Sequence, residues 1–183
     1  MKKFLPILVL LAAFCGFLAI QVSMDQVQTS ANQSTTVKDK DVRFENLFKT
    51  TKVQTIDKKE LVFKDLKKPI IILNFWASWC SPCLKELPAL KKLAETFPET
   101  LHVITINTDE DDQAKAIQKI KDKYKLDLDI VADAGGKLAD QFLITNIPYS
   151  IIYINGSIYK THQGYFDFLD PVLDKYFRTV LKK

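Results

Sequence analysis

Two cysteines three residues apart, Cys80 and Cys83, stand where a continuous apolar stretch changes into an amphipathic one. The stretch before them, residues 69–76 ("PIIILNFW"), is rich in β-branched residues, as in a strand that is buried on both faces. After them, apolar residues recur at helical spacing until Pro98 ends the pattern. The pair is therefore expected at the junction of a buried strand and a helix, which points to an α/β fold.

Strand and helix patterns alternate through the rest of the chain. Further strands are predicted at residues 52–56, 60–63, 101–107 and 127–132, with a hairpin over 149–162 that turns at Asn155-Gly156. Further helices are predicted after the acidic residues 108–112 ("TDEDD"), which supply the helix N-terminus, at 135–144, and after Asp170-Pro171. The last helix should bury Leu173, Tyr176, Phe177, Val180 and Leu181. The order predicts a mixed central β-sheet flanked by helices.

Composition excludes several kinds of site. With 47% hydrophobic and 26% charged residues, the 183-residue chain is globular. Its net charge of +4 comes from lysines scattered among acids, so a nucleic acid partner is not expected. Three cysteines (Cys15, Cys80, Cys83) and two histidines (His102, His162) make a four-ligand zinc site unfavourable, and five glycines leave no place for a dinucleotide fingerprint. No metal and no cofactor other than the cysteine pair itself is expected.

The N-terminus has the pattern of an export signal. Two lysines precede an apolar run over residues 4–20, and the positive end should stay in the cytoplasm. Residues 1–22 are interpreted as an uncleaved membrane anchor, with Cys15 inert inside it; a cleaved signal, which would leave a secreted or periplasmic protein, is the alternative. Residues 23–41 are polar and predict a flexible tether. Residues 42–183 then form one domain outside the cytoplasm.

A Cys-x-x-Cys pair beside alternating strands and helices indicates redox chemistry. Cys80 falls at a helix N-terminus, where unpaired backbone N–H groups favour the thiolate, and Pro82 suits the first helical turn. Cys83 lies one turn further on, close enough to resolve a mixed disulfide. A purely structural disulfide is the alternative, but so short a loop gives little stabilisation.

These residues match a known family. Residues 74–88 ("NFWASWCSPCLKELP") resemble the active site of thioredoxins, most closely the membrane-tethered thiol-disulfide oxidoreductases of the TlpA/ResA/DsbE (CcmG) type. Residues 147–159 ("IPYSIIYINGSIY") resemble the cis-proline strand and hairpin of this family, and the similarity extends over about residues 42–183. It implies a thioredoxin-like fold.

The resemblance also implies roles for single residues. Trp79 would shield the sulfur and contact partners, with core packing as the alternative. The Ile147-Pro148 bond would be cis and would present backbone to a partner chain. The substrate-contacting set would be Trp79, Ser81, Pro82, Ile147 and Pro148, whereas Phe75, Trp76 and Pro88 would be structural.

Two further positions distinguish the tethered reductases from ordinary thioredoxins. Ordinary thioredoxins have a buried aspartate where this chain has Asn74, which does not titrate, and the tethered reductases carry a glutamate where this chain has Glu86. Cys83 and Glu86 are three apart on a helix and can share a face, so Glu86 could accept the proton of Cys83. The alternative is a solvated Glu86 paired with a lysine.

The expected function is an extracytoplasmic, membrane-anchored protein-disulfide reductase, with Cys80, Cys83 and Glu86 as catalytic residues. Ser81-Pro82 places no positive charge between the cysteines, which favours a reducing potential. The resemblance implies a membrane electron donor and protein substrates, with apocytochrome c as one candidate, and we expect a monomer. A disulfide oxidase or isomerase, a non-catalytic module that binds cysteine-bearing proteins, and a thiol peroxidase are the alternatives, the peroxidase being the least favoured.

Overall fold

The computed structural model describes residues 39–180, together with Phe14, Phe17 and Gln21. The chain divides into two units, residues 1–43 and 44–183, and the second carries the fold described below. Almost all of the predicted anchor and tether, Cys15 included, lies outside the described residues. Within the residues described, no helix is long and apolar enough to cross a membrane.

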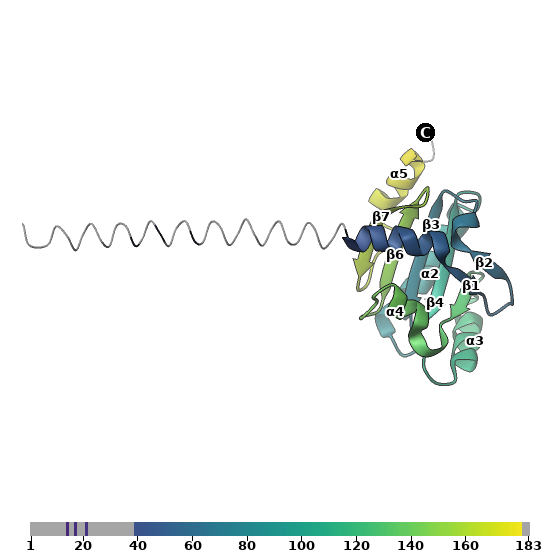
Figure 1. Ribbon diagram of the computed structural model, residues 1–183. Helices are drawn as coiled ribbons and strands as arrows, with labels where there is room; N and C mark the ends of the chain where they lie inside the picture. Colours follow the sequence, from purple (N-terminus) through teal and green to yellow (C-terminus); the bar gives the residue numbers. More distant parts are fainter. Residues whose placement is uncertain (1–13, 15–16, 18–20, 22–38, 181–183) are drawn as a thin grey trace, which may run out of the picture. The chain divides into compact units, whose positions relative to one another are not determined.

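A five-stranded mixed sheet forms the centre of the second unit (Figure 1). Its order is β5 (Asp129–Ala132), β4 (Leu101–Asn107), β3 (Ile70–Trp76), β6 (Tyr149–Ile154) and β7 (Ser157–Gln163). The pairs β3–β4 and β4–β5 are parallel, while β3–β6 and β6–β7 are antiparallel. The predicted mixed α/β sheet is thus confirmed.

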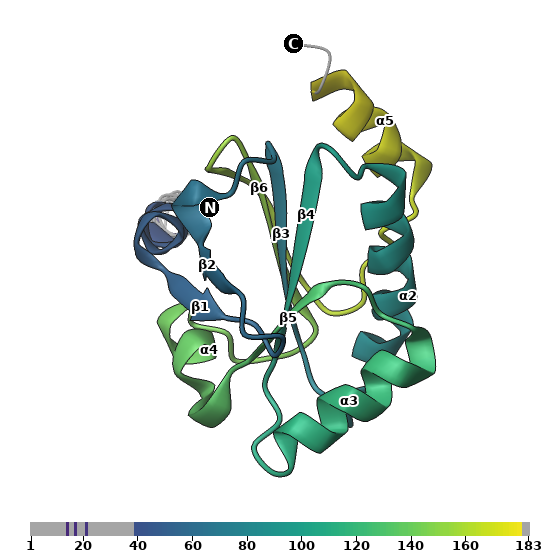
Figure 2. The same ribbon diagram turned by 90° about the vertical axis from the view of Figure 1, so that its right-hand side faces the viewer.

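The sheet separates two hydrophobic layers (Figure 2). On one face lie α2 (Ser81–Thr96), α3 (Gln113–Tyr124) and α5 (Pro171–Val180); on the other lie α4 (Lys137–Gln141) and the two-stranded sheet of β1 (Lys52–Gln54) and β2 (Glu60–Val62). Residues of β3 alternate between the layers: Ile70 and Ile72 pack in the first, Ile71 and Leu73 in the second. Every residue of β3 is buried, as its apolar sequence predicts.

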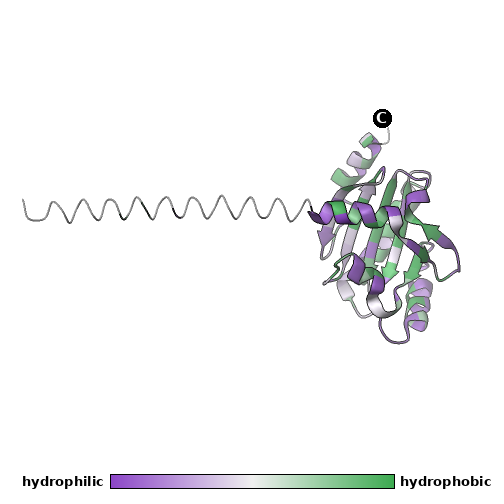
Figure 3. Cartoon of the chain, viewed as in Figure 1, coloured by the Kyte–Doolittle hydropathy of each residue, from purple (hydrophilic) through white to green (hydrophobic). Residues whose placement is uncertain are grey.

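The hydropathy of the residues differs between the central strands and the outer helices. Figure 3 shows the central strands as mainly hydrophobic, whereas α3 presents a largely hydrophilic surface. In α3 only Ile117 and Ile120 are buried, and in α5 only Leu173 and Phe177 are. Tyr176 and Val180 are half-buried, and Leu181 lies outside the described residues.

Two local features differ from the sequence prediction. Residues 39–50 are helical, which was not predicted, and they include the end of the predicted tether; Phe44 and Phe48 of this segment are buried in the second layer. The acidic residues 108–112 do precede α3, but they do not cap it: Asp112 makes no side-chain capping hydrogen bond and the first turn holds no acidic residue. Asp109 is instead buried, and its carboxylate accepts the backbone N–H of Ser78.

Candidate active site

The two cysteines lie at the start of α2, four residues after β3 ends. Cys80 is the N-cap residue, and the Cys83 backbone N–H donates to Cys80 Sγ over 3.3 Å. The two sulfurs form a disulfide, with 5.3 Å between the Cα atoms. Both cysteines are buried, but Cys80 is 5% exposed whereas Cys83 is fully buried, so Cys80 is the more accessible of the two. Ser81 and Pro82 are exposed on the first turn of the helix.

The Ile147-Pro148 peptide bond is cis, which confirms the prediction. Pro148 immediately precedes β6, and because Tyr149 pairs with Phe75 of β3, the proline lies at the same end of the sheet as the cysteines. Ile147 packs against the hydrophobic layer that contains both cysteines. The Pro148 carbonyl accepts a hydrogen bond from Gly164 N–H over 2.8 Å, which ties this loop to the end of β7.

Trp79 points outward rather than into the core. Its side chain is 73% exposed, so the core-packing alternative is wrong, whereas Trp76 is fully buried. Its backbone segment is fixed by Ser78 N–H, which donates to both carboxylate oxygens of Asp109 over 3.0 and 3.2 Å. An exposed tryptophan on a fixed segment directly before Cys80 is suited to contact a partner chain.

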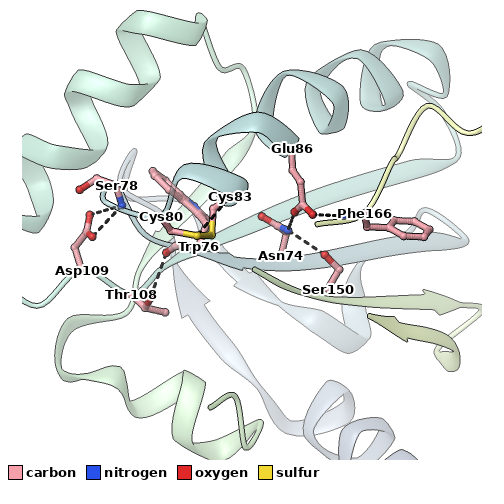
Figure 4. The surroundings of a disulfide bond; sticks show 10 residues. All are labelled: Asn74, Trp76, Ser78, Cys80, Cys83, Glu86, Thr108, Asp109, Ser150 and Phe166. Carbon is pink, nitrogen blue, oxygen red and sulfur yellow. Dashed lines mark hydrogen bonds between the residues drawn. A yellow bond between two sulfur atoms is a disulfide. The ribbon is translucent and has the colours of Figure 1, made fainter. Parts of the chain in front are cut away.

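Glu86 is buried one turn beyond Cys83 (Figure 4). One carboxylate oxygen accepts from Asn74 Nδ2 over 3.1 Å and the other from the backbone N–H of Phe166. Burial raises the pKa of Glu86 to about 7, although both hydrogen bonds act to lower it. The alternative of a solvated, lysine-paired glutamate is therefore wrong.

Three contributors to this region were not predicted. Ser150 lies opposite Asn74 in the β3–β6 pairing and its hydroxyl accepts from Asn74 Nδ2 over 2.9 Å. Phe166 donates its backbone N–H to Glu86, a contact that the identity of the side chain does not predict. Asp109 lies two residues after the end of β4. An acidic residue near the carboxyl end of the strand that pairs with the cysteine-bearing β3 is the sequence signal that could have indicated it.

The two histidines lie outside this arrangement. His102 Nε2 is 2.6 Å from Asp129 Oδ2, and Lys59 Nζ lies 2.9 Å from the same oxygen. These partners hold the pKa of Asp129 below its ordinary value. His162 Nε2 lies 3.1 Å from the carbonyl oxygen of Tyr165. Neither histidine contacts a cysteine in the part of the chain that the structure describes.

The raised pKa of Glu86 predicts a pH-dependent stability. Because the folded-state value is about 7 against 4.5 for an ordinary glutamate, the free energy of unfolding falls as the pH rises through this window and stays low above it. Glutamine would keep an acceptor for Phe166 and remove the buried charge. We expect Glu86→Gln to raise the free energy of unfolding by about 2 kcal/mol at about pH 8 and to leave it unchanged at about pH 4.

Urea unfolding of the oxidised protein across this pH range measures the effect. The wild-type and Glu86→Gln curves should diverge as the pH rises. Two parallel curves would show that the carboxylate is not destabilised in the fold.

Comparison with known proteins places this site in a family. The family model described as the AhpC/TSA family matches residues 44–162, which is more than half of the chain. The chain belongs to the AhpC/TSA family. This region includes the cysteine pair, Asn74, Glu86 and the cis-proline.

The relatives of this AhpC/TSA family member include thioredoxin-like and ResA proteins, as the resemblance in the sequence predicts. The thioredoxin-like protein YneN of Bacillus subtilis is 31% identical over 113 residues, covering 61% of this chain and 66% of YneN. The thiol-disulfide oxidoreductase ResA of Halalkalibacterium halodurans is 30% identical over 114 residues, covering 61% of this chain and 64% of ResA. The similarity thus spans less than two thirds of each curated relative.

A solved structure shows the same fold. The crystal structure of StoA from Bacillus subtilis matches with a TM-score of 0.58 and 27% identity, covering 70% of this chain and 93% of StoA. The predicted resemblance to the ResA-type, thioredoxin-like proteins is confirmed.

Proposed function

We propose that this protein is a thiol-disulfide oxidoreductase that reduces disulfides in other proteins outside the cytoplasm. The observation that carries the proposal is the cysteine pair at the N-terminus of α2, in which Cys80 is the more accessible residue, at the same end of the sheet as the cis-Pro148 loop. The names of ResA and its relatives as thiol-disulfide oxidoreductases support the reaction type.

The reaction follows from the two unequal sulfurs. In the reduced protein the Cys80 thiolate attacks a substrate disulfide, forms a mixed disulfide with one substrate sulfur and releases the other as a thiolate. Cys83 then loses its proton to Glu86, and its thiolate attacks Cys80 Sγ and releases the second substrate sulfur. The substrate gains two electrons and the protein ends as the Cys80–Cys83 disulfide.

Glu86 is suited to the proton step because of its burial. A carboxylate with a pKa of about 7 is a stronger base than an exposed glutamate, so Glu86 is better suited to accept a proton from a thiol. In this proposal the substrate chain lies against the exposed residues Trp79, Ser81 and Pro82 and against the loop of half-buried Ile147 and buried Pro148.

The remaining parts of the proposal concern the cellular setting. Residues 1–22 anchor the protein in the bacterial membrane with the folded unit on the outer side, and a membrane electron donor re-reduces the disulfide. Apocytochrome c is one substrate class for such a reductase. These points rest on the export-type N-terminus and on the family resemblance.

The reduction potential of the pair tests the direction of electron flow. Equilibrating the full chain in detergent with thiol buffers of known potential should give a value near or below ~−270 mV, that of thioredoxin. A value near ~−120 mV would make the protein an oxidant or isomerase instead. If the pair forms no reversible disulfide, the binding-module alternative replaces the enzyme.

A further inference from the structure

Two hollows are lined by the exposed Trp79, the residue that directly precedes Cys80. One has a volume of about 370 Å³ and the other of about 180 Å³. Trp79 and Thr108 line both, so the two hollows adjoin one another across these side chains. The smaller one is bounded mainly by apolar groups next to the cis-proline; its further residues are Ala139, Ile144, Thr145, Asn146 and Ile147.

The larger hollow differs in its charge. Besides Trp79 and Thr108, it is lined by Ser78, Asp109, Glu110 and Asp111. In Figure 4, Asp109 and Ser78 lie on one side of the disulfide and Glu86 on the other, so this acidic side is separate from the buried glutamate.

The acidic segment is held in place by its buried member. Besides the Ser78 N–H, Asp109 Oδ2 accepts from Asn107 Nδ2 over 3.0 Å, and the Asp109 N–H donates to Asn107 Oδ1 over 3.1 Å. Gln113 Nε2 adds a hydrogen bond to the Asn107 carbonyl over 2.9 Å. The Asp109 carboxylate thus accepts its hydrogen bonds from within the protein. These bonds fix residues 109–111 against the backbone that carries Trp79.

Glu110 and Asp111, unlike Asp109, face the solvent. Both are exposed, and within the part of the chain that the structure describes neither makes a hydrogen bond or an ion pair. Two carboxylates beside an aromatic ring suit a cation, because the ring face also attracts positive charge. The surface therefore complements a lysine or arginine, although the chain as a whole carries a net charge of +4.

We infer that the substrates carry a lysine or arginine next to the disulfide cysteine that Cys80 attacks, together with an apolar side chain. The cation lies between Trp79, Glu110 and Asp111, and the apolar side chain enters the smaller hollow beside Ile147. This inference rests on the proposed function and names the class of polypeptide that the site selects.

The test compares two peptides that each contain one intramolecular disulfide. They are identical except that the residue beside the first cysteine is lysine in one and glutamate in the other, with leucine on its far side in both. The full chain in detergent is reduced, freed of reductant and mixed with each peptide, and the single-turnover rate of peptide thiol formation is measured. A small neutral disulfide, 2-hydroxyethyl disulfide, is reduced in parallel.

The lysine peptide should react about 10-fold faster than the glutamate peptide at low ionic strength. The preference should shrink to about 2-fold at ~1 M salt, where the screening length is ~3 Å. The charge reversal Glu110→Lys/Asp111→Lys should invert the preference. The matched control Glu95→Lys/Glu99→Lys makes the same change in charge in the last turn of α2 and just beyond it, and this variant should keep the preference for the lysine peptide. Should the first variant not fold by circular dichroism, Glu110→Gln/Asp111→Asn should abolish the preference.

The outcomes separate the two proposals. Equal rates for both peptides, or a faster glutamate peptide, together with reduction of the neutral disulfide, would overturn the cation site and leave the reductase proposal standing. A protein that reduces none of the three disulfides would overturn the proposed function itself.

Discussion

A Cys83→Ser variant of the full chain should stop at the mixed disulfide and lose turnover by about 10³-fold or more, because an external thiol must then replace an intramolecular one. Cys80 is 5% exposed and Cys83 is fully buried, so we expect a substrate to form its bond with Cys80. Once bound there, it can be displaced efficiently only by the thiol three residues further along α2. The variant should therefore accumulate a covalent complex.

Mass spectrometry under non-reducing conditions measures this complex after incubation with a disulfide peptide. The Cys80→Ser variant is the matched control, since it keeps one thiol but places it where no substrate reaches, and it should form no complex. If Cys80→Ser formed the adduct and Cys83→Ser did not, the roles of the two sulfurs would be reversed.

A Glu86→Gln variant should reduce a peptide disulfide about 100-fold more slowly at about pH 7. In the oxidised form seen in Figure 4 the Cys83 sulfur carries no proton, and the carboxylate engages Asn74 and Phe166. When the disulfide opens, Cys83 becomes a fully buried thiol, and Glu86 is a buried carboxylate one turn further along the same helix. Glutamine keeps the shape of the side chain but accepts no proton.

The pH profile distinguishes this role from a structural one. The wild-type rate should rise through an apparent pKa of about 7, and this step should be missing from Glu86→Gln. Glu99→Gln, an exposed glutamate just beyond the far end of α2, is the control and should retain both rate and profile. Because Glu86→Gln is expected to be the more stable protein at this pH, slower turnover could not be attributed to unfolding. An unchanged rate and profile would exclude Glu86 from the proton step.

Local patterns were sufficient to predict the fold. The run of β3, apolar except for Asn74, and the Asn155-Gly156 turn each have one strong local interpretation, and the structure agrees with both. The helix over residues 39–50 was missed because it begins in a polar segment, and only the spacing of Phe44 and Phe48 indicated a buried face. Packing against the sheet, which local propensity does not encode, stabilises it.

The surroundings of the cysteines were only partly predictable. The spacing of Cys83 and Glu86 within one helix is visible in the sequence, whereas the partners of Glu86 are not. Asn74 and Ser150 meet because of the register between two antiparallel strands that are far apart in the chain, and a shift by one residue would separate them. Acidic residues favour helix starts, so the sequence around Asp109 predicts a helix cap. In the structure the Asp109 carboxylate is buried and accepts the Ser78 N–H instead of capping α3.

The contrast between the two tryptophans gives the protein a pair of intrinsic fluorescent reporters. The chain contains only Trp76 and Trp79. Trp76 is fully buried in the hydrophobic layer that contains the disulfide, a group that quenches indole emission, whereas Trp79 is largely in water. Emission at short wavelength would follow the opening of the disulfide, and emission at long wavelength would follow the arrival of a substrate chain. Electron transfer and docking are thereby observable as separate events without an added label.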